Sequence, residues 1–192
     1  MTWRKRRQLR SSLEQRVLAG ERKADIVGQA AVDGQDWQRM ARILALIPTP
    51  ASRSRYRWLN RVLIGLLVLA EVGEVAAALA SAQSYGDHSL WLVVDFLWVA
   101  AILFVVWEVA RFRMYGYSGA LAFALLRGVW WVLSVAMRHE VSLPLALVYA
   151  QIALLATIAV VATVTQRFLL PKTRWTDSKP KTDAAGVLVF EE

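Results

Sequence analysis

The order of polar and apolar residues divides the chain into three parts. Residues 62–169 are predominantly apolar, whereas residues 1–61 and 170–192 are rich in polar and charged side chains. A helix that crosses the hydrocarbon core of a bilayer needs about 20 mostly apolar residues. Four segments of the central part meet this requirement, namely residues 62–83, 90–109, 118–137 and 143–169. The pattern predicts an all-α integral membrane protein with a four-transmembrane-helix bundle.

The N-terminal part carries an amphipathic helical pattern. Small and apolar residues recur at steps of four and three, which is heptad spacing, and predict a helix over about residues 11–31. These residues are Leu13, Val17, Gly20, Ala24, Val27 and Ala31. A second helix is predicted over about residues 35–47, with Asp33 as its cap and Pro48 as its end. Its apolar residues share one side, which suits a helix on the membrane surface and equally a helix packed on a partner.

The C-terminal part, residues 170–192, is polar, and we expect it to be disordered. It closes on a short apolar segment, Val187–Phe190, followed by two glutamates. Such a terminus can add as a strand to the sheet edge of a partner protein. An inert terminus is the alternative.

Positive charge is distributed unevenly along the chain. There are 23 Lys and Arg residues against 15 Asp and Glu, which gives a formal net charge of +8. Fourteen of the basic residues precede residue 62, two lie in the 110–117 loop and five lie in residues 167–181. The opposite side of the predicted membrane domain holds Arg138 as its single basic residue. Because segments rich in Lys and Arg stay inside, both termini are expected in the cytoplasm, with the protein in the cell (inner) membrane.

The candidate chemistry does not point to an enzyme. The sequence has no cysteine, which excludes disulfides, thiolate catalysis and Cys-based zinc sites. Nothing resembles a nucleophile–base pair or a metal motif. The two histidines stand beside acids in short loops, as Asp87-His88 and His139-Glu140, without ligand spacing. No catalytic residue, metal or cofactor is therefore predicted.

A cluster of charges lies within the predicted spans. Glu71 and Glu74 are near the middle of the first span, Asp95 is inside the second, and Arg127 is near the middle of the third. An isolated charge at the bilayer centre costs about 2.5–3.5 kcal/mol on insertion scales. We therefore expect Arg127 to pair with Glu71 or Glu74. Since three acids face one base, at least one acid must be protonated, or must face water or a cation.

Two interpretations of this cluster remain open. The charges can form a polar clasp that fixes the register of the helices, with the surplus acid neutral. They can also form a proton or cation site within the membrane, because intramembrane acids often mark ion pathways. Glu108 is a separate case, because it lies at a span end three residues before Arg111 and predicts an ion pair at the interface.

Two basic groups flank the N-terminal helices. They consist of Arg4, Lys5, Arg6, Arg7 and Arg10 near the start of the chain, and of Arg53, Arg55, Arg57 and Arg61 before the first span. Juxtamembrane basic residues attract anionic lipid, and they bind nucleic acid without sequence specificity. The alternative is a purely topogenic role, in which the charges hold the N-terminus inside.

These features predict a non-enzymatic polytopic membrane protein. We expect an accessory component of a larger assembly, for example a mobile-element, transfer or secretion system, by analogy with small basic-tailed proteins of that kind. Its basic N-terminal region would face DNA, anionic lipid or a protein partner. The alternative is a small transporter or pore with an intramembrane carboxylate as its proton or cation site. In either case the chain can form a homo-oligomer or join a larger membrane complex.

Overall fold

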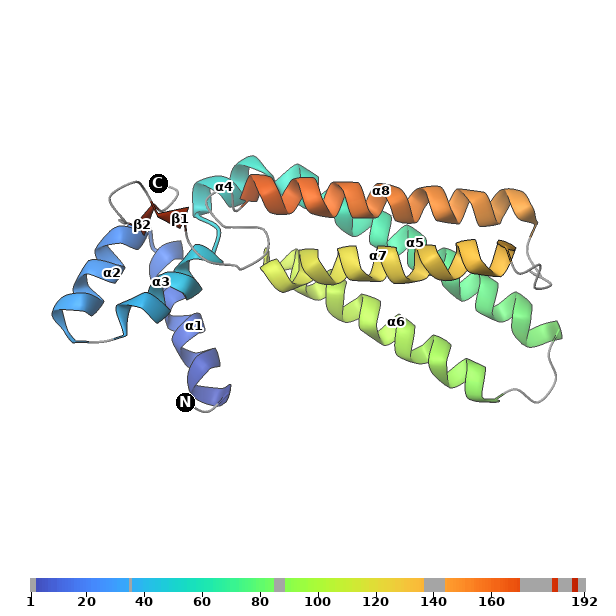
Figure 1. Cartoon of the computed structure of the whole chain (residues 1–192), viewed down its shortest axis with the longest axis horizontal. Helices are drawn as coiled ribbons and strands as arrows, with labels where there is room; N and C mark the ends of the chain where they lie inside the picture. The colour runs from blue at the N-terminus through green and yellow to red at the C-terminus, as the bar shows by residue number, and fades with distance from the viewer. Residues whose placement is uncertain are drawn as a thin grey trace. The chain divides into compact units, whose positions relative to one another are not determined.

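The described part of the protein is almost entirely α-helical. The computed structural model describes residues 3–34, 36–84, 89–136, 144–169, 181–182 and 188–189. Within these residues the elements of Figure 1 follow one another in chain order. They are α1 (Trp3–Leu18), α2 (Lys23–Val32), α3 (Trp37–Ala45), α4 (Pro50–Arg55), α5 (Arg57–Ser84), α6 (Ser89–Ala110), α7 (Met114–Ala136), α8 (Leu145–Leu169), β1 (Lys181–Thr182) and β2 (Leu188–Val189). They form two compact units. One consists of residues 58–165, and the other, which we call the N-terminal unit, consists of residues 1–57 together with residues 166–192.

The N-terminal helices α1, α2 and α3 pack around a small apolar core of their own. Its fully buried members are Leu13, Val17, Ile26, Leu44 and Ile47, and further apolar side chains from the three helices pack against them. α3 therefore packs against both α1 and α2. This core belongs to the N-terminal unit and uses no residue of the long helices α5–α8.

The prediction of one continuous helix over residues 11–31 is wrong. α1 ends at Leu18 and α2 begins at Lys23. Between them Gly20 adopts φ +93°, a conformation that glycine enters without the steric cost of a Cβ atom. Arg16 bridges the turn by donating hydrogen bonds to Glu21 (2.8 Å) and to Gln29 (2.6 Å). The heptad-spaced residues thus serve two helices that fold on α3.

The second N-terminal helix also differs from its prediction. Asp36, rather than Asp33, caps α3, because its carboxylate accepts a hydrogen bond of 3.1 Å from the backbone N–H of Arg39. Ala41 and Leu44 are fully buried in the core of the N-terminal unit. The apolar side of α3 therefore packs within the same chain, and a helix lying on the membrane surface is not what the structure shows.

Four residues of the C-terminal part, which we expected to be disordered, form a short antiparallel pair of strands. Lys181 pairs with Val189, and Thr182 pairs with Leu188. The apolar end of the chain therefore finds its strand partner within the same chain. The rest of residues 170–192 lies outside the described part of the structure, as do both His–acid pairs of the short loops.

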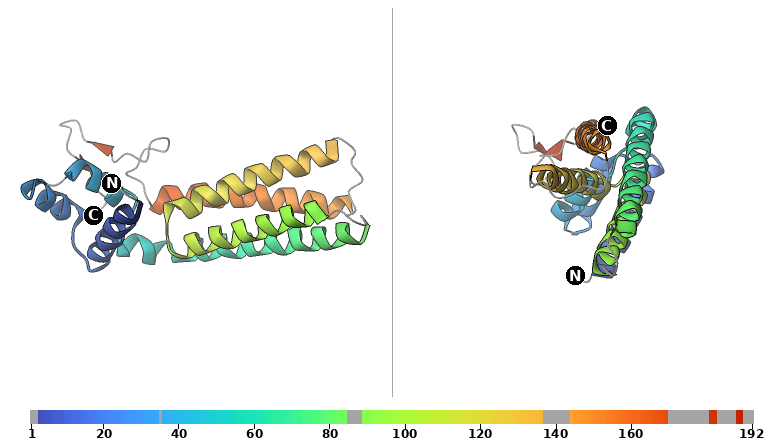
Figure 2. Two further views of the ribbon diagram at one scale, coloured as in Figure 1. Left: turned by 90° about the horizontal axis from the view of Figure 1, so that it is seen from below. Right: turned by 90° about the vertical axis from the view of Figure 1, so that its right-hand side faces the viewer.

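The long helices α5–α8 lie side by side, and successive helices run in opposite directions (Figures 1 and 2). Each of them overlaps one of the four apolar segments predicted from the sequence. The buried residues of a helix recur at steps of three and four, which places them on one side of it. On α5 these residues are Leu63, Leu67, Ala70 and Glu74, and on α8 they are Val148, Leu155, Ile158, Ala162 and Thr165.

Two glycines allow α7 to pack closely on α6. A Cβ atom on Gly116 would lie 2.5 Å from the backbone nitrogen of Val109 and 2.7 Å from the carbonyl carbon of Glu108. A Cβ atom on Gly119 would lie 3.0 Å from a methyl group of Val105. The first contact is with backbone, which cannot move aside as a flexible side chain can.

A buried polar network joins α5, α6 and α7 near the α6–α7 turn. Asn60 donates a hydrogen bond of 3.0 Å to the carbonyl oxygen of Val109, and its own side-chain oxygen accepts one of 2.6 Å from the hydroxyl of Tyr117. Glu108 is buried and forms an ion pair of 2.7 Å with Arg113. The predicted partner, Arg111, instead stacks over the ring of Trp107.

Among the residues that the structure describes, two helical segments have the length and composition of a membrane span. They are Met114–Leu133 within α7 and Leu145–Leu169, the whole of α8. The described residues Leu97–Ala110 of α6 form a shorter apolar stretch. These helices support membrane association on length and composition alone.

Candidate functional site

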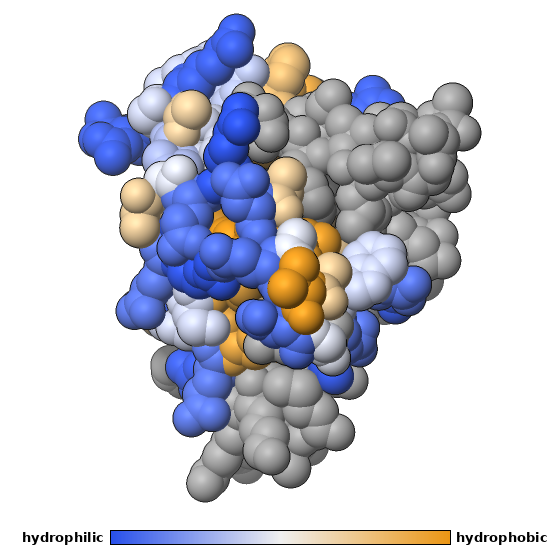
Figure 3. All heavy atoms as spheres, turned by 90° about the vertical axis from the view of Figure 1, so that its left-hand side faces the viewer, coloured by the Kyte–Doolittle hydropathy of each residue, from blue (hydrophilic) through white to orange (hydrophobic). Residues whose placement is uncertain are grey.

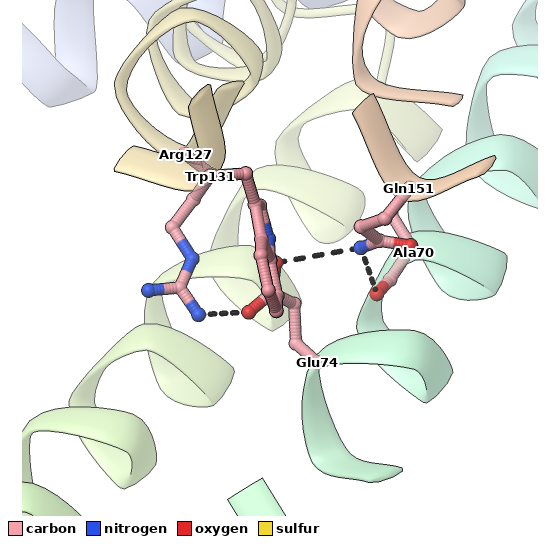
Figure 4. Close-up of polar contacts among 5 residues, drawn as sticks. All are labelled: Ala70, Glu74, Arg127, Trp131 and Gln151. Atoms are coloured by element: carbon pink, nitrogen blue, oxygen red, sulfur yellow. Dashed lines mark hydrogen bonds and ion pairs between the residues drawn. The ribbon is translucent and has the colours of Figure 1, made fainter. Parts of the chain in front are cut away.

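The central polar feature of the long helices is the carboxylate of Glu74 on α5. Arg127 on α7 donates from Nη2 to Oε2 of Glu74 in a buried ion pair. Trp131, one turn further along α7, donates from Nε1 to Oε1 of Glu74 at 3.0 Å. Gln151 on α8 donates from Nε2 to the same oxygen at 3.3 Å. Three side chains from two neighbouring helices thus converge on one carboxylate, as Figure 4 shows.

Gln151 connects α8 to the backbone of α5 as well. Its Nε2 donates a second hydrogen bond, of 3.2 Å, to the carbonyl oxygen of Ala70. Gly73 lies directly against this amide, since a Cβ atom at that position would be 2.7 Å from Oε1 of Gln151. The missing side chain at Gly73 therefore makes room for the amide that reaches Glu74.

The ion pair between Glu74 and Arg127 is shielded from solvent, and a side chain of α6 also contacts it. The side chain of Glu74 is 6% exposed and that of Arg127 is 12% exposed. The guanidinium carbon of Arg127 lies 5.3 Å from the centroid of the Trp98 ring on α6, within the range of a cation–π interaction. Residues from α5, α6, α7 and α8 therefore meet around one carboxylate–guanidinium pair, which we call the Glu74 clasp.

Glu71 lies one turn before Glu74 on α5 but does not take part in the Glu74 clasp. Both of its carboxylate oxygens are buried, and neither has a hydrogen-bond partner among the described residues. Its neighbours Leu69 and Val72 are exposed on the outside of the unit, at 57% and 60%. Glu71 is therefore a shielded acid that the donors of the Glu74 clasp leave unsatisfied.

Of the three predicted cluster charges whose side chains the structure describes, two form an ion pair. The prediction that Arg127 pairs with Glu71 or Glu74 is confirmed, and the structure selects Glu74. Glu71 is within electrostatic reach of Arg127 but is not bonded to it. Asp95 lies on α6, and its side chain is outside the described part of the structure.

Sequence reasoning missed the two neutral donors of the site, Trp131 and Gln151. Gln151 had a usable signal, because it is an uncharged polar residue in the middle of a strongly apolar segment. A buried amide needs hydrogen-bond partners, so its presence there points to a polar contact with another helix. Trp131 gave no comparable signal, because it stands beside Trp130 and either residue could have faced inward.

The Glu74 clasp is suited to holding helices together rather than to exchanging ligands. Its carboxylate accepts hydrogen bonds from a guanidinium, an indole and an amide that come from two other helices. No group of three or more acids and histidines among the described residues could hold a metal ion. A proton or cation entering here would have to displace Arg127 or break the bonds from Trp131 and Gln151.

The predicted basic residues fall into different environments. Arg53 is not available to a ligand, because it forms an ion pair of 2.8 Å with Glu14 on α1. Arg55 lies over the ring of Tyr56. Arg7, Arg57 and Arg61 are exposed, and Arg10 is half-buried. The side chains of Arg4, Lys5 and Arg6 are outside the described part of the structure, although their backbone belongs to α1.

Comparison of the chain with protein families, with curated proteins and with solved structures found no match. The chemistry of the molecule therefore rests on its own residues: the Glu74 clasp, the unsatisfied Glu71 and the basic N-terminal unit.

Proposed function

We propose that this chain is a non-enzymatic, polytopic membrane protein that serves as an anchored component of a larger assembly. The helices α5–α8 are its four spans, both termini lie in the cytoplasm, and the basic N-terminal unit faces a polyanionic or acidic partner there. The observation that carries the proposal is the separate core of α1, α2 and α3. A purely topogenic segment needs positive charge but does not need a packed apolar core.

The exposed surface of the long helices supports a role for all four as spans. α5 and α6 expose large apolar side chains just as α7 and α8 do. On α5 these include Val62, Val68, Leu69, Val72 and Leu79, and on α6 they include Leu97, Leu103 and Phe104. Soluble monomers rarely expose contiguous apolar patches of more than a few hundred Å². Contact with lipid would remove the free-energy cost of exposing these apolar side chains to water on each of the four helices.

Topology can be tested with single cysteines, because the chain has none of its own. In intact cells, Gly86→Cys should react with a membrane-impermeant maleimide, whereas Tyr115→Cys should react only after permeabilisation. The bias of Lys and Arg toward both termini and the α6–α7 turn sets this expectation. The reverse labelling would contradict the orientation. If neither residue were labelled in intact cells, both would lie on the cytoplasmic side. The helices α5 and α6 would then not cross the membrane, and α7 and α8 would be the two spans.

The N-terminal unit carries the charge that the proposal requires. Residues 1–57 contain 13 Lys and Arg against five Asp and Glu. Hydrophilic side chains dominate the face of the molecule shown in Figure 3, with apolar residues in small patches between them. Because its apolar side chains are used in its own core, the unit would meet a partner mainly through charge.

Binding of a short DNA duplex to the full-length protein in zwitterionic nanodiscs tests this surface. Affinity should fall steeply with salt, because neutralising phosphates releases counterions. Replacing Arg42 and Arg57 by Gln should weaken binding and reduce the salt slope by about one for each arginine that contacts a phosphate. Arg16→Gln is the matched control and should have a smaller effect, because Arg16 is bonded to Glu21 and Gln29.

Anionic vesicles in place of the duplex separate a lipid partner from a nucleic acid. Binding that does not depend on salt, or no binding of either polyanion at low salt, would leave the basic residues with a topogenic role. It would also remove the main support for a polyanionic partner.

One observation favours a small proton or cation transporter as the second candidate. Transport needs an acid that can exchange its ligand, and Glu71 is such an acid because its oxygens are not committed to donors. Protein reconstituted into liposomes with a pH-sensitive dye should then dissipate an imposed proton gradient, and Glu71→Gln should abolish the flux. Liposomes that stay tight would favour the anchoring role.

A further inference from the structure

The carboxyl group of Glu71 is buried, and no group in the described part of the structure stabilises its negative charge through a hydrogen bond. Both carboxylate oxygens are buried without a hydrogen-bond partner among the described residues. Arg127 (through Nη2), Trp131 and Gln151 direct their hydrogen bonds to Glu74, and Glu71 accepts none of them. An ionised carboxylate that is removed from water without donors is strongly disfavoured, and such a group neutralises instead.

We infer that Glu71 is a proton-binding site, which holds its proton at neutral pH and exchanges it while Glu74 stays ionised. The two acids of α5 thus have opposite protonation states, set by which of them receives the donors of α7 and α8. This inference goes beyond the proposed anchoring role, and it holds whether or not the protein moves ions across the membrane.

A proton fits this site better than a metal cation. Hard cations such as Ca²⁺ and Mg²⁺ require about six or more oxygen ligands. The described residues contain no cluster of three or more acids and histidines that could supply them. A proton needs no ligand other than the carboxylate itself.

Loss of this proton would bear directly on the Glu74 clasp. Among the described residues, Arg127 on α7 is the charged group that acts electrostatically on Glu71, and Glu74 lies one turn away on the same helix. Arg127 keeps an unused donor, because its buried Nε has no acceptor. An ionised Glu71 would compete with Glu74 for this guanidinium. The proton at Glu71 therefore keeps Arg127 committed to Glu74.

Labelling with dicyclohexylcarbodiimide tests the inference on the intact protein in detergent. This apolar reagent reacts with protonated carboxyl groups in apolar surroundings. The carboxyl oxygen bonds to the central carbon of the carbodiimide, the proton moves to a nitrogen, and an acyl shift gives a stable one-to-one N-acylurea. The exposed apolar residues Leu69 and Val72 beside Glu71 give the reagent access from the lipid side.

We expect mass spectrometry to place the adduct on Glu71 at neutral pH. Labelling should fall about tenfold per pH unit above its midpoint, as the protonated fraction falls. Glu71→Gln should lose the label while its thermal midpoint stays unchanged, because the amide is a neutral replacement for the acid. Glu74→Asp, which preserves the charge, should keep the label on Glu71.

Several results would overturn the inference. Labelling of Glu74 to the same extent as Glu71, or no labelling of Glu71 at any pH in protein that remains folded, would show that the two acids are not in opposite states. Modification of Glu71 by a water-soluble carbodiimide plus an amine nucleophile would place it in water. Protection by sodium but not by choline would make a metal cation the occupant.

Discussion

Replacing Arg127 by Leu should lower the free energy of unfolding by about 3–5 kcal/mol, the cost of removing one partner of a buried ion pair. The side chains of Glu74 and Arg127 are both shielded, so water cannot solvate the carboxylate that is left behind. The stacking of the guanidinium on Trp98 is lost as well. Equilibrium unfolding of the purified protein in mixed detergent–SDS micelles measures the change.

A double variant separates the charge from the packing. Glu74→Gln should be destabilising by itself, because it leaves Arg127 as an uncompensated buried cation. Combined with Arg127→Leu, it should recover most of the stability, since the amide oxygen can still accept from Trp131 and Gln151 and no charge remains. Glu71→Gln is the matched control one turn away, and it should leave stability unchanged. If Arg127→Leu were as stable as the parent, the Glu74 clasp would not hold the bundle together.

The second large effect is expected at Gly116. Its substitution by Ala should cost about 1–3 kcal/mol, as overpacking in a well-packed interior does. The added Cβ atom would meet the backbone of Val109 and Glu108 at 2.5–2.7 Å, so α6 and α7 would have to move apart. Their separation would also disturb the hydrogen bond from Asn60 to Val109. Unfolding in mixed micelles again gives the free energy.

Gly65→Ala provides the matched control for Gly116→Ala. Both glycines are helical, but a Cβ atom at Gly65 meets nothing within 4 Å. That substitution should be neutral or stabilising by up to about 1 kcal/mol, since Ala is the better helix former. Equal effects at the two positions would mean that the close approach of α6 and α7 does not limit stability. A loss of stability at Gly116 but not at Gly65 would show that the close approach of α6 and α7 does limit stability.

The positions of the long helices could be predicted from the sequence, because each requires a long apolar run and each run produced one helix. The turn at Gly20 could not be predicted in the same way. The heptad-spaced residues from Leu13 to Ala31 fit one helix or two equally well, since the spacing describes only which residues share a side. What favours the turn is the core that α1 and α2 make with α3, and that core exists only after folding.

At the site, the sequence determined that Arg127 had to be paired, because the cost of an isolated charge in an apolar segment does not depend on tertiary detail. It could not choose between Glu71 and Glu74, which are three residues apart and lie on one side of α5. Only the tertiary structure decided, because Trp131 and Gln151 come from α7 and α8 and both direct their N–H groups at Glu74. Hydrogen bonds between helices depend on their rotation and separation, which the order of residues along one helix does not specify.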